Sequence, residues 1–175
     1  MLNIIFEEQK KFLKEALVKE KLNGFNFNRS NFPVDLHCRF DQERLKSAAW
    51  RVVEEISEVR EAPEDEGKME VVDVICFSVN LALMAGIDTP PKIPKNHHGE
   101  AFHLAIHHLG LAMNELKNRP WRSSYTFTDT RAFKAQLKAF LGYIFAAAYD
   151  ILGDDLVDYY LRKNRINWNR QTEGY

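Results

Sequence analysis

The sequence predicts an all-α protein, a bundle of about five to six helices. Two observations predict this fold class. Apolar residues recur every three to four positions over most of the chain, the spacing that gathers them on one face of a helix. The alternation of apolar and polar residues that is typical of strands is not sustained outside the loops. We expect one domain over residues 1–175, a length that suffices to bury a core.

The first half of the chain predicts three helices. The first covers residues 3–22 and ends at Asn23 and Gly24, and a loop rich in Asn, Phe and Pro follows over 24–40. The second covers residues 41–61 and ends at Ala62-Pro63. After a short acidic connection, the third ends near Gly86. Because so short a link joins the second and third helices, we expect them to form an antiparallel hairpin around which the bundle is built.

The second half predicts three more helices and two connectors. The connectors cover residues 88–96 and 121–128, which are rich in proline and in polar and aromatic residues respectively. We expect the helices over residues 97–117, from Asp129 or Thr130 to Gly153, and from Asp154 to Ile166, followed by a polar tail over 167–175.

Composition and charge exclude several classes of protein. A net charge of −1 gives no reason to expect nucleic-acid binding, which usually requires a basic excess. Cys38 and Cys76 are the two cysteines, which favours a reducing compartment. The N-terminal residues lack the pattern of a signal peptide, and charged residues interrupt the apolar runs too often for a membrane span. We therefore expect a cytoplasmic protein.

Two acidic motifs on the expected hairpin predict a metal site. Glu54, Glu55 and Glu58 form an EExxE motif, and Glu70 and Asp73 form an ExxD motif. Acids three or four residues apart share one face of a helix. Asp73 also stands in a strongly apolar run, where carboxylates are costly unless a cation neutralises them. Hard oxygen ligands of this kind suit Mg²⁺. The alternative is that these acids are solvated residues of amphipathic helices, as in a non-catalytic helical interaction protein.

Histidines between His97 and His108 raise the alternative of a different metal site. Glu100 and His103 form one Glu-x-x-His, whereas a di-metal bundle uses two. His103 and His107 have the spacing of a zinc pair but lack an evident third ligand. We expect these histidines to form hydrogen bonds or to lie at an interface.

The C-terminal segment predicts a site for phosphates. Lys163, Asn167 and Arg170 share one helical face, and Tyr175 follows as a further donor. Cationic side chains on one face suit a polyphosphate. Because the sequence contains neither a Walker loop nor a GxGxxG motif, phosphate binding would depend on Mg²⁺ and on these side chains.

The acidic motifs and the tail KNRINWNRQTEGY together resemble the all-α nucleoside triphosphate pyrophosphatases, the MazG-like and dimeric dUTPase group. The resemblance covers residues 41–86 and 155–175, and more loosely the first helix, but not residues 88–150. It implies a homodimeric hydrolase that depends on Mg²⁺, with Mn²⁺ as an alternative ion. Its substrate would be a deoxynucleoside triphosphate, which it splits into the monophosphate and pyrophosphate. dUTP is the leading substrate, and dCTP or a wider set is the alternative.

The resemblance also implies a role for each matching residue. Mg²⁺ would be bound by Glu55, Glu58, Glu70 and Asp73, and Glu54 would orient or deprotonate the attacking water. The phosphates would be held by Lys163, Asn167, Arg170 and Tyr175. The nucleoside would be contacted by Gln9, Phe77, Asn80 and Trp50. Cys76 departs from the family pattern, which usually has a histidine there, and Leu13 replaces a residue that is often polar. Both departures bear on the choice of base.

Overall fold

The computed structural model describes residues 2–22 and 33–173, and within these ranges every regular element is a helix, with no strand. The predicted all-α fold is confirmed. A short 3₁₀ helix, Gly153–Asp155, joins the last two of the α-helices. The α-helices of the described ranges are α1 (Leu2–Leu22), α2 (Arg39–Glu61), α3 (Glu64–Met84), α4 (Ala101–Glu115), α5 (Thr130–Leu152) and α6 (Leu156–Thr172).

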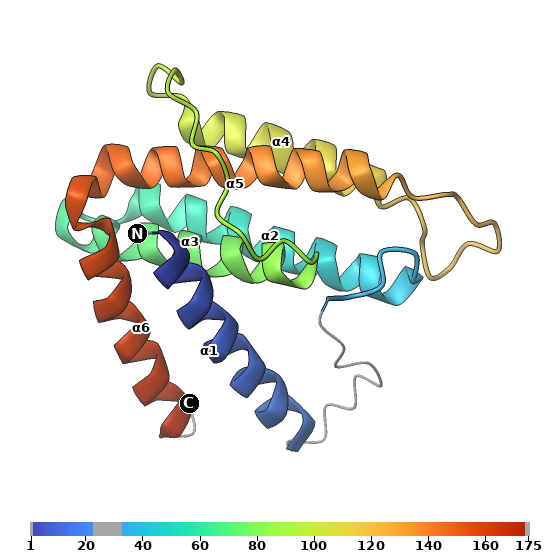
Figure 1. Cartoon of the computed structure of the whole chain (residues 1–175), viewed down its shortest axis with the longest axis horizontal. Coiled ribbons are helices and arrows are strands. Elements are labelled where there is room, and N and C mark those ends of the chain that lie inside the picture. The colour runs from blue at the N-terminus through green and yellow to red at the C-terminus, as the bar shows by residue number, and fades with distance from the viewer. Residues whose placement is uncertain (1, 23–32, 174–175) are drawn as a thin grey trace.

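Four of the helices form a body, and the other two form an arm that extends from it. Figure 1 shows α4 beside α5 in one layer and α2 beside α3 below them. Ala62 and Pro63 join α2 to α3, and the two helices run in opposite directions. α1 and α6 pack against each other and against α3, and their C-terminal halves extend away from the four-helix body.

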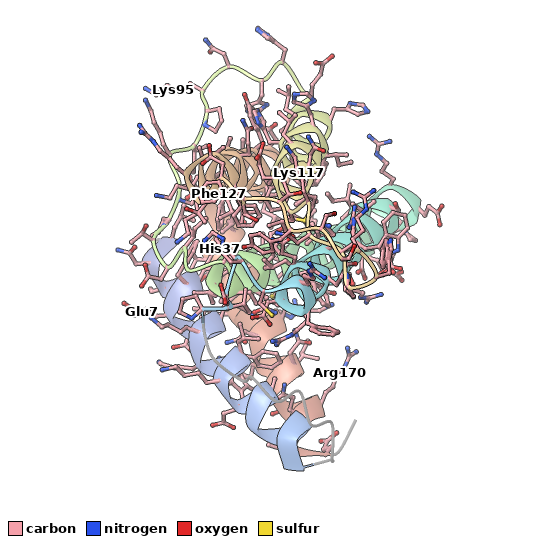
Figure 2. The ribbon with its side chains drawn as sticks, turned by 90° about the vertical axis from the view of Figure 1, so that its right-hand side faces the viewer. Glu7, His37, Lys95, Lys117, Phe127 and Arg170 are labelled. Atoms are coloured by element: carbon pink, nitrogen blue, oxygen red, sulfur yellow. The ribbon has the colours of Figure 1, made fainter. Side chains whose placement is uncertain are left out.

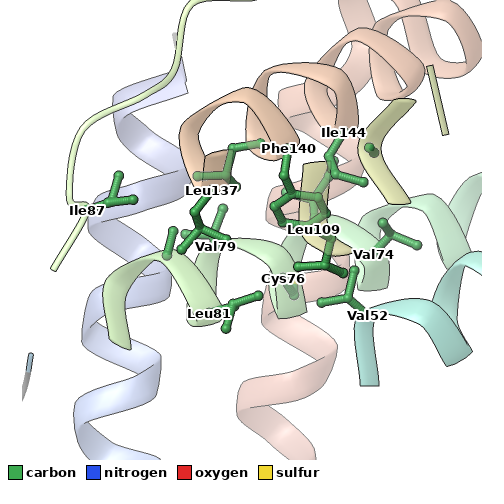
Figure 3. Close-up of a cluster of buried hydrophobic side chains, with 14 of the residues drawn as sticks. Val52, Val74, Cys76, Val79, Leu81, Ile87, Leu109, Leu137, Phe140 and Ile144 are labelled. Atoms are coloured by element: carbon green, nitrogen blue, oxygen red, sulfur yellow. The ribbon is translucent and has the colours of Figure 1, made fainter. Parts of the chain in front are cut away.

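The core lies around α3, the helix that contacts the largest number of other helices. Figure 3 shows Val79 on the side of α3 that faces Leu137 of α5, and Leu81 on the other side of α3; all three are fully buried. A helix with neighbours on most sides must be apolar on most faces, which explains the nearly continuous apolar run of α3. An acidic residue on this helix therefore lies beside the core of the protein.

Two helix boundaries differ from the sequence prediction. The fourth helix begins at Ala101 rather than at residue 97, because His98 and Gly99 have φ angles of 47° and 76°. These left-handed conformations interrupt a helix. The last helix continues to Thr172, so most of the predicted polar tail is helical. Trp168 on this extension packs edge-on against Phe12 of α1, with ring centroids 5.4 Å apart. Tertiary contact therefore stabilises a segment whose polarity indicated a tail.

No helix of the described ranges is long and apolar enough to cross a membrane.

Candidate active site

Three carboxylates from neighbouring helices converge at one place. Glu55 lies on α2, and Glu70 and Asp73 lie one turn apart on α3. One oxygen of each lies within 4.8 Å of the others. Acids three or four residues apart share one face of a helix, and the packing of α2 along α3 brings the acidic faces of the two helices together. Glu55 is only 4% exposed, so the cluster is partly shielded from water.

The electrostatics of the cluster suit a cation. Burial, together with the nearby Glu58 and Asp73, raises the pKa of Glu55 to about 7. Burial is also the main cause that raises the pKa of Glu70. Crowded and desolvated carboxylates resist ionisation, and a bound divalent ion removes this cost. An all-oxygen donor set of this kind fits Mg²⁺.

Two basic side chains already contact the acids. Lys163 of α6 is buried, and its Nζ lies 2.5 Å from Oδ2 of Asp73. Arg51 of α2 contacts Glu55 at 3.0 Å and Glu54 at 2.5 Å. Its guanidinium also lies 5.2 Å from the centre of the Phe77 ring. The sequence analysis missed Arg51, although its spacing of four residues from Glu55 is typical of a helical ion pair.

A cleft of about 430 Å³ opens beside the carboxylates. It lies between the arm and the body, since its walls come from α1, α2, α3 and α6. Figure 2 shows Arg170 on the arm formed by α1 and α6. The lining residues are Gln9, Phe12, Arg51, Glu55, Glu58, Asp73, Cys76, Phe77, Asn80, Asn167, Arg170 and Gln171. The cleft thus has carboxylates, cations, amides and aromatic rings on its walls.

A chain of hydrogen bonds lies at the amide side of the cleft. The Tyr160 hydroxyl donates to Oε1 of Gln9 at 2.9 Å, and Nε2 of Gln9 donates to Oδ1 of Asn80 at 3.0 Å. Gln9 is 2% exposed and Tyr160 is fully buried. The sequence analysis missed Tyr160, because only the packing of α6 on α1 brings it to Gln9.

Eight of the predicted site residues line the cleft: Gln9, Glu55, Glu58, Asp73, Phe77, Asn80, Asn167 and Arg170. Glu58 is exposed and lies outside the carboxylate trio. Glu70 lies at the acidic end of the cleft as a member of the trio. Lys163 lies there too, because it contacts Asp73. Glu54 is paired with Arg51 and is absent from the lining. Tyr175 lies outside the described residues.

The structure does not bring Trp50 to this cleft. Its side chain is 65% exposed and lines a separate groove with Val53 of α2 and Ile106 of α4. One position along an α-helix turns the side chain by about 100°. Trp50 therefore points away from the side of α2 that carries Arg51 and does not line this cleft.

The histidines of the 97–108 segment have local partners. His108 contacts Gln136 at 2.7 Å and stacks on Tyr143. His97 lies 3.4 Å from Asp150, and His103 lies 3.4 Å from Arg60. In the part of the chain that the structure describes, the acidic trio is the one group with the geometry of a metal site. His108 thus forms a hydrogen bond of the kind predicted for these histidines, whereas Nδ1 of His97 forms none with the described residues.

A comparison with protein families finds one matching model, described as dUTPase, over residues 56–175. The match covers more than half of the chain and includes α3 to α6, among them Glu70, Asp73 and Lys163. No curated protein and no solved structure matches the chain.

Proposed function

The chain belongs to the dUTPase family, the all-α dimeric dUTPases, and from this premise we propose that it hydrolyses dUTP to the monophosphate and pyrophosphate with the help of Mg²⁺. Family membership implies a hydrolase that acts on nucleoside triphosphates. The observation that carries the proposal is the convergence of Glu55, Glu70 and Asp73 beside a cleft with amides and cations on its walls. This arrangement offers separate places for a metal ion, a polyphosphate and a base.

The acidic end of the cleft would hold Mg²⁺. Glu55, Glu70 and Asp73 would supply the ligands, with Glu58 joining them from the exposed rim. When bound, Mg²⁺ would polarise the phosphate and make a nearby water a better nucleophile. Glu54 is proposed to orient or deprotonate this water. For that role its carboxylate must leave Arg51, its partner in the structure.

The other residues would bind and position the substrate. Asn167 and Arg170 line the cleft from α6 and would hold the phosphates, together with Lys163 and Tyr175. Cationic side chains at this place offset the charge of the leaving pyrophosphate. Phe77 offers a ring face to the base, and Gln9 and Asn80 offer amides to its polar edge.

A screen of pyrophosphate release tests the proposal. The full-length protein is incubated with each common nucleoside triphosphate, with Mg²⁺ or with a chelator. We expect release that requires Mg²⁺, with dUTP as the best substrate. A preference for dCTP or for a wider set would change the substrate but keep the chemistry. Release from none of the nucleotides would contradict the proposal and favour a non-catalytic helical interaction protein.

We propose that the protein acts as a homodimer, as the family resemblance implies. Sedimentation equilibrium measures the mass of the assembly directly. A mass twice that of the 20.4 kDa chain supports the dimer, and the mass of a single chain contradicts it.

A further inference from the structure

The hydrogen bonds at the amide side of the cleft have a direction. The Tyr160 hydroxyl has one proton, and its nearest acceptor is Oε1 of Gln9 at 2.9 Å, whereas the Ile5 carbonyl lies at 3.3 Å. Because Oε1 of Gln9 accepts this proton, the Gln9 NH₂ group turns the other way, towards Oδ1 of Asn80. The side-chain oxygen of Asn80 is then engaged, and its NH₂ group is left to donate into the cleft.

Burial keeps this direction fixed. Tyr160 is fully buried and Gln9 is 2% exposed, so water does not compete for their hydrogen bonds. Burial is the main cause that raises the pKa of Tyr160 far above its ordinary value, so the hydroxyl keeps its proton under all working conditions. If the Gln9 amide were reversed, the hydroxyl would accept from the Gln9 NH₂ group, and its own proton would be left with the longer contact to the Ile5 carbonyl at 3.3 Å.

A donor at this place distinguishes between the pyrimidine bases. Uracil has a carbonyl oxygen at position 4, which accepts a hydrogen bond, whereas cytosine has an amino group there, which donates one. An Asn80 NH₂ group that faces position 4 of the base would match the first and oppose the second. Discrimination by a hydrogen-bonding site is strong because a mismatch leaves buried polar groups unpaired.

We propose that Tyr160 is a positioning residue for base selection: through Gln9 it orients Asn80 to present a donor, which selects a 4-oxo pyrimidine over a 4-amino pyrimidine. The inference rests on the proposed function and extends it from the acidic end of the cleft to a residue that does not itself line the cleft. It also gives a physical reason why dUTP is preferred to dCTP.

The test measures kcat/KM for dUTP and dCTP with Mg²⁺ in the native protein and in two variants. We expect kcat/KM of the native protein to be at least about tenfold higher for dUTP than for dCTP, which is the ratio that one hydrogen bond contributes. Tyr160→Phe removes the proton that fixes Gln9, so the preference should fall by about tenfold. Tyr159→Phe is the matched control: Tyr159 is the neighbouring tyrosine, lines a different groove with Asp158 and Arg162, and should leave the preference unchanged.

Gln9→Glu tests the direction of the hydrogen bonds by itself. An ionised carboxylate at this position accepts from both Tyr160 and Asn80, so Asn80 must turn its oxygen into the cleft. The ratio is therefore measured at a pH high enough to ionise this buried group. The preference should then shift towards dCTP. Since both substrates carry the same triphosphate, the added negative charge cancels from their ratio.

The possible outcomes separate this inference from the proposed function. If the native protein hydrolyses neither nucleotide, the proposed function fails and the inference fails with it. If it hydrolyses both but prefers dCTP, the inference alone is overturned. An unchanged ratio in a folded Tyr160→Phe protein, or in Gln9→Glu, overturns it as well. A ratio that falls in Tyr160→Phe and shifts towards dCTP in Gln9→Glu, with Tyr159→Phe unaffected, supports it.

Discussion

The site holds its carboxylates close together at a position from which water is partly excluded. Asp73 has Lys163 as its partner, and Glu55 has Arg51. These ion pairs neutralise part of the cluster, yet the pKa of Glu55 is still raised to about 7. Protons and basic side chains therefore compete for the carboxylate oxygens that a metal ion would bind.

The raised pKa of Glu55 predicts how stability depends on pH without metal. The folded protein holds a proton on Glu55 up to pH of about 7, whereas the unfolded chain releases it near its ordinary value of 4.5. The contribution of Glu55 to stability is therefore present at low pH and is lost as the pH rises from 4.5 to 7. In the presence of a chelator, the melting temperature of Glu55→Gln should therefore depend less on pH over this range than that of the native protein. A profile that is the same in both proteins would contradict the assignment.

Lys163 should compete with Mg²⁺ for Asp73. Lys163→Met removes the competing cation, so we expect lower stability of the metal-free protein, by about 1–3 kcal/mol, because Asp73 loses its partner. We also expect tighter binding of Mg²⁺ in calorimetric titrations without nucleotide. Lys10→Met is the control, since the ion pair of Lys10 with Asp88 is exposed and its atoms lie 3.7 Å apart. Weaker binding of Mg²⁺ in Lys163→Met would contradict the competition.

Arg170 should act on the phosphates rather than on the nucleoside. It lines the cleft on α6, at the face it shares with Asn167. Arg170→Ala should therefore weaken binding of a triphosphate more than binding of the corresponding nucleoside, as measured by calorimetry. Equal losses for both ligands would remove the phosphate role from this residue.

At the scale of the elements, the helices could be predicted from the sequence, but the packing of α6 on α1 could not. The acidic motifs, the short link at Pro63 and the apolar spacing predict α2 and α3 from local sequence alone. The cleft, however, requires α6 to pack on α1, and Tyr160 and Gln9 are 151 residues apart in the chain. Local patterns carry no information about such a contact. For the same reason the sequence alone did not place Trp50 in the groove between α2 and α4: α2 packs against both α3 and α4, and spacing does not tell which partner a residue faces.

Two glycines in the middle of helices offer a test of the packing of elements. Figure 1 shows the connector between α3 and α4 crossing α5. A Cβ atom at Gly142 of α5 would lie 2.6 Å from the carbonyl oxygen of Lys92 and 3.2 Å from Pro94. Gly142→Ala should therefore lower the free energy of unfolding by about 1–3 kcal/mol, since the connector must move.

Gly110 of α4 is the matched control, because a Cβ there would meet nothing within 4 Å. Gly110→Ala should stabilise the protein by up to about 1 kcal/mol through helix propensity. Denaturant unfolding of both variants measures the difference. Equal effects of the two substitutions would contradict the close contact between the connector and α5.

At the scale of the whole molecule, the body supplies the acids of the cleft, and α6 of the arm supplies an amide and a cation that face the same cleft. Glu55 and Asp73 are held on two packed helices of the body, whereas Asn167 and Arg170 lie on α6. Rigid placement of the acids suits a metal site, which needs its ligands held in a fixed geometry. The sequence predicted both groups of residues, but only the packing of the arm on α3 shows that they face the same cleft.

The most direct test of the central claim compares two aspartates. The initial rate of pyrophosphate release from dUTP with Mg²⁺ is measured for the native protein, Asp73→Asn and Asp88→Asn, with helical circular dichroism as a check on folding. Asp73 belongs to the acidic trio, whereas Asp88 is an exposed acid outside the site. The account predicts that Asp73→Asn lowers the rate by about a thousandfold or more and that Asp88→Asn leaves it unchanged. A folded Asp73→Asn protein that keeps the native rate would contradict it.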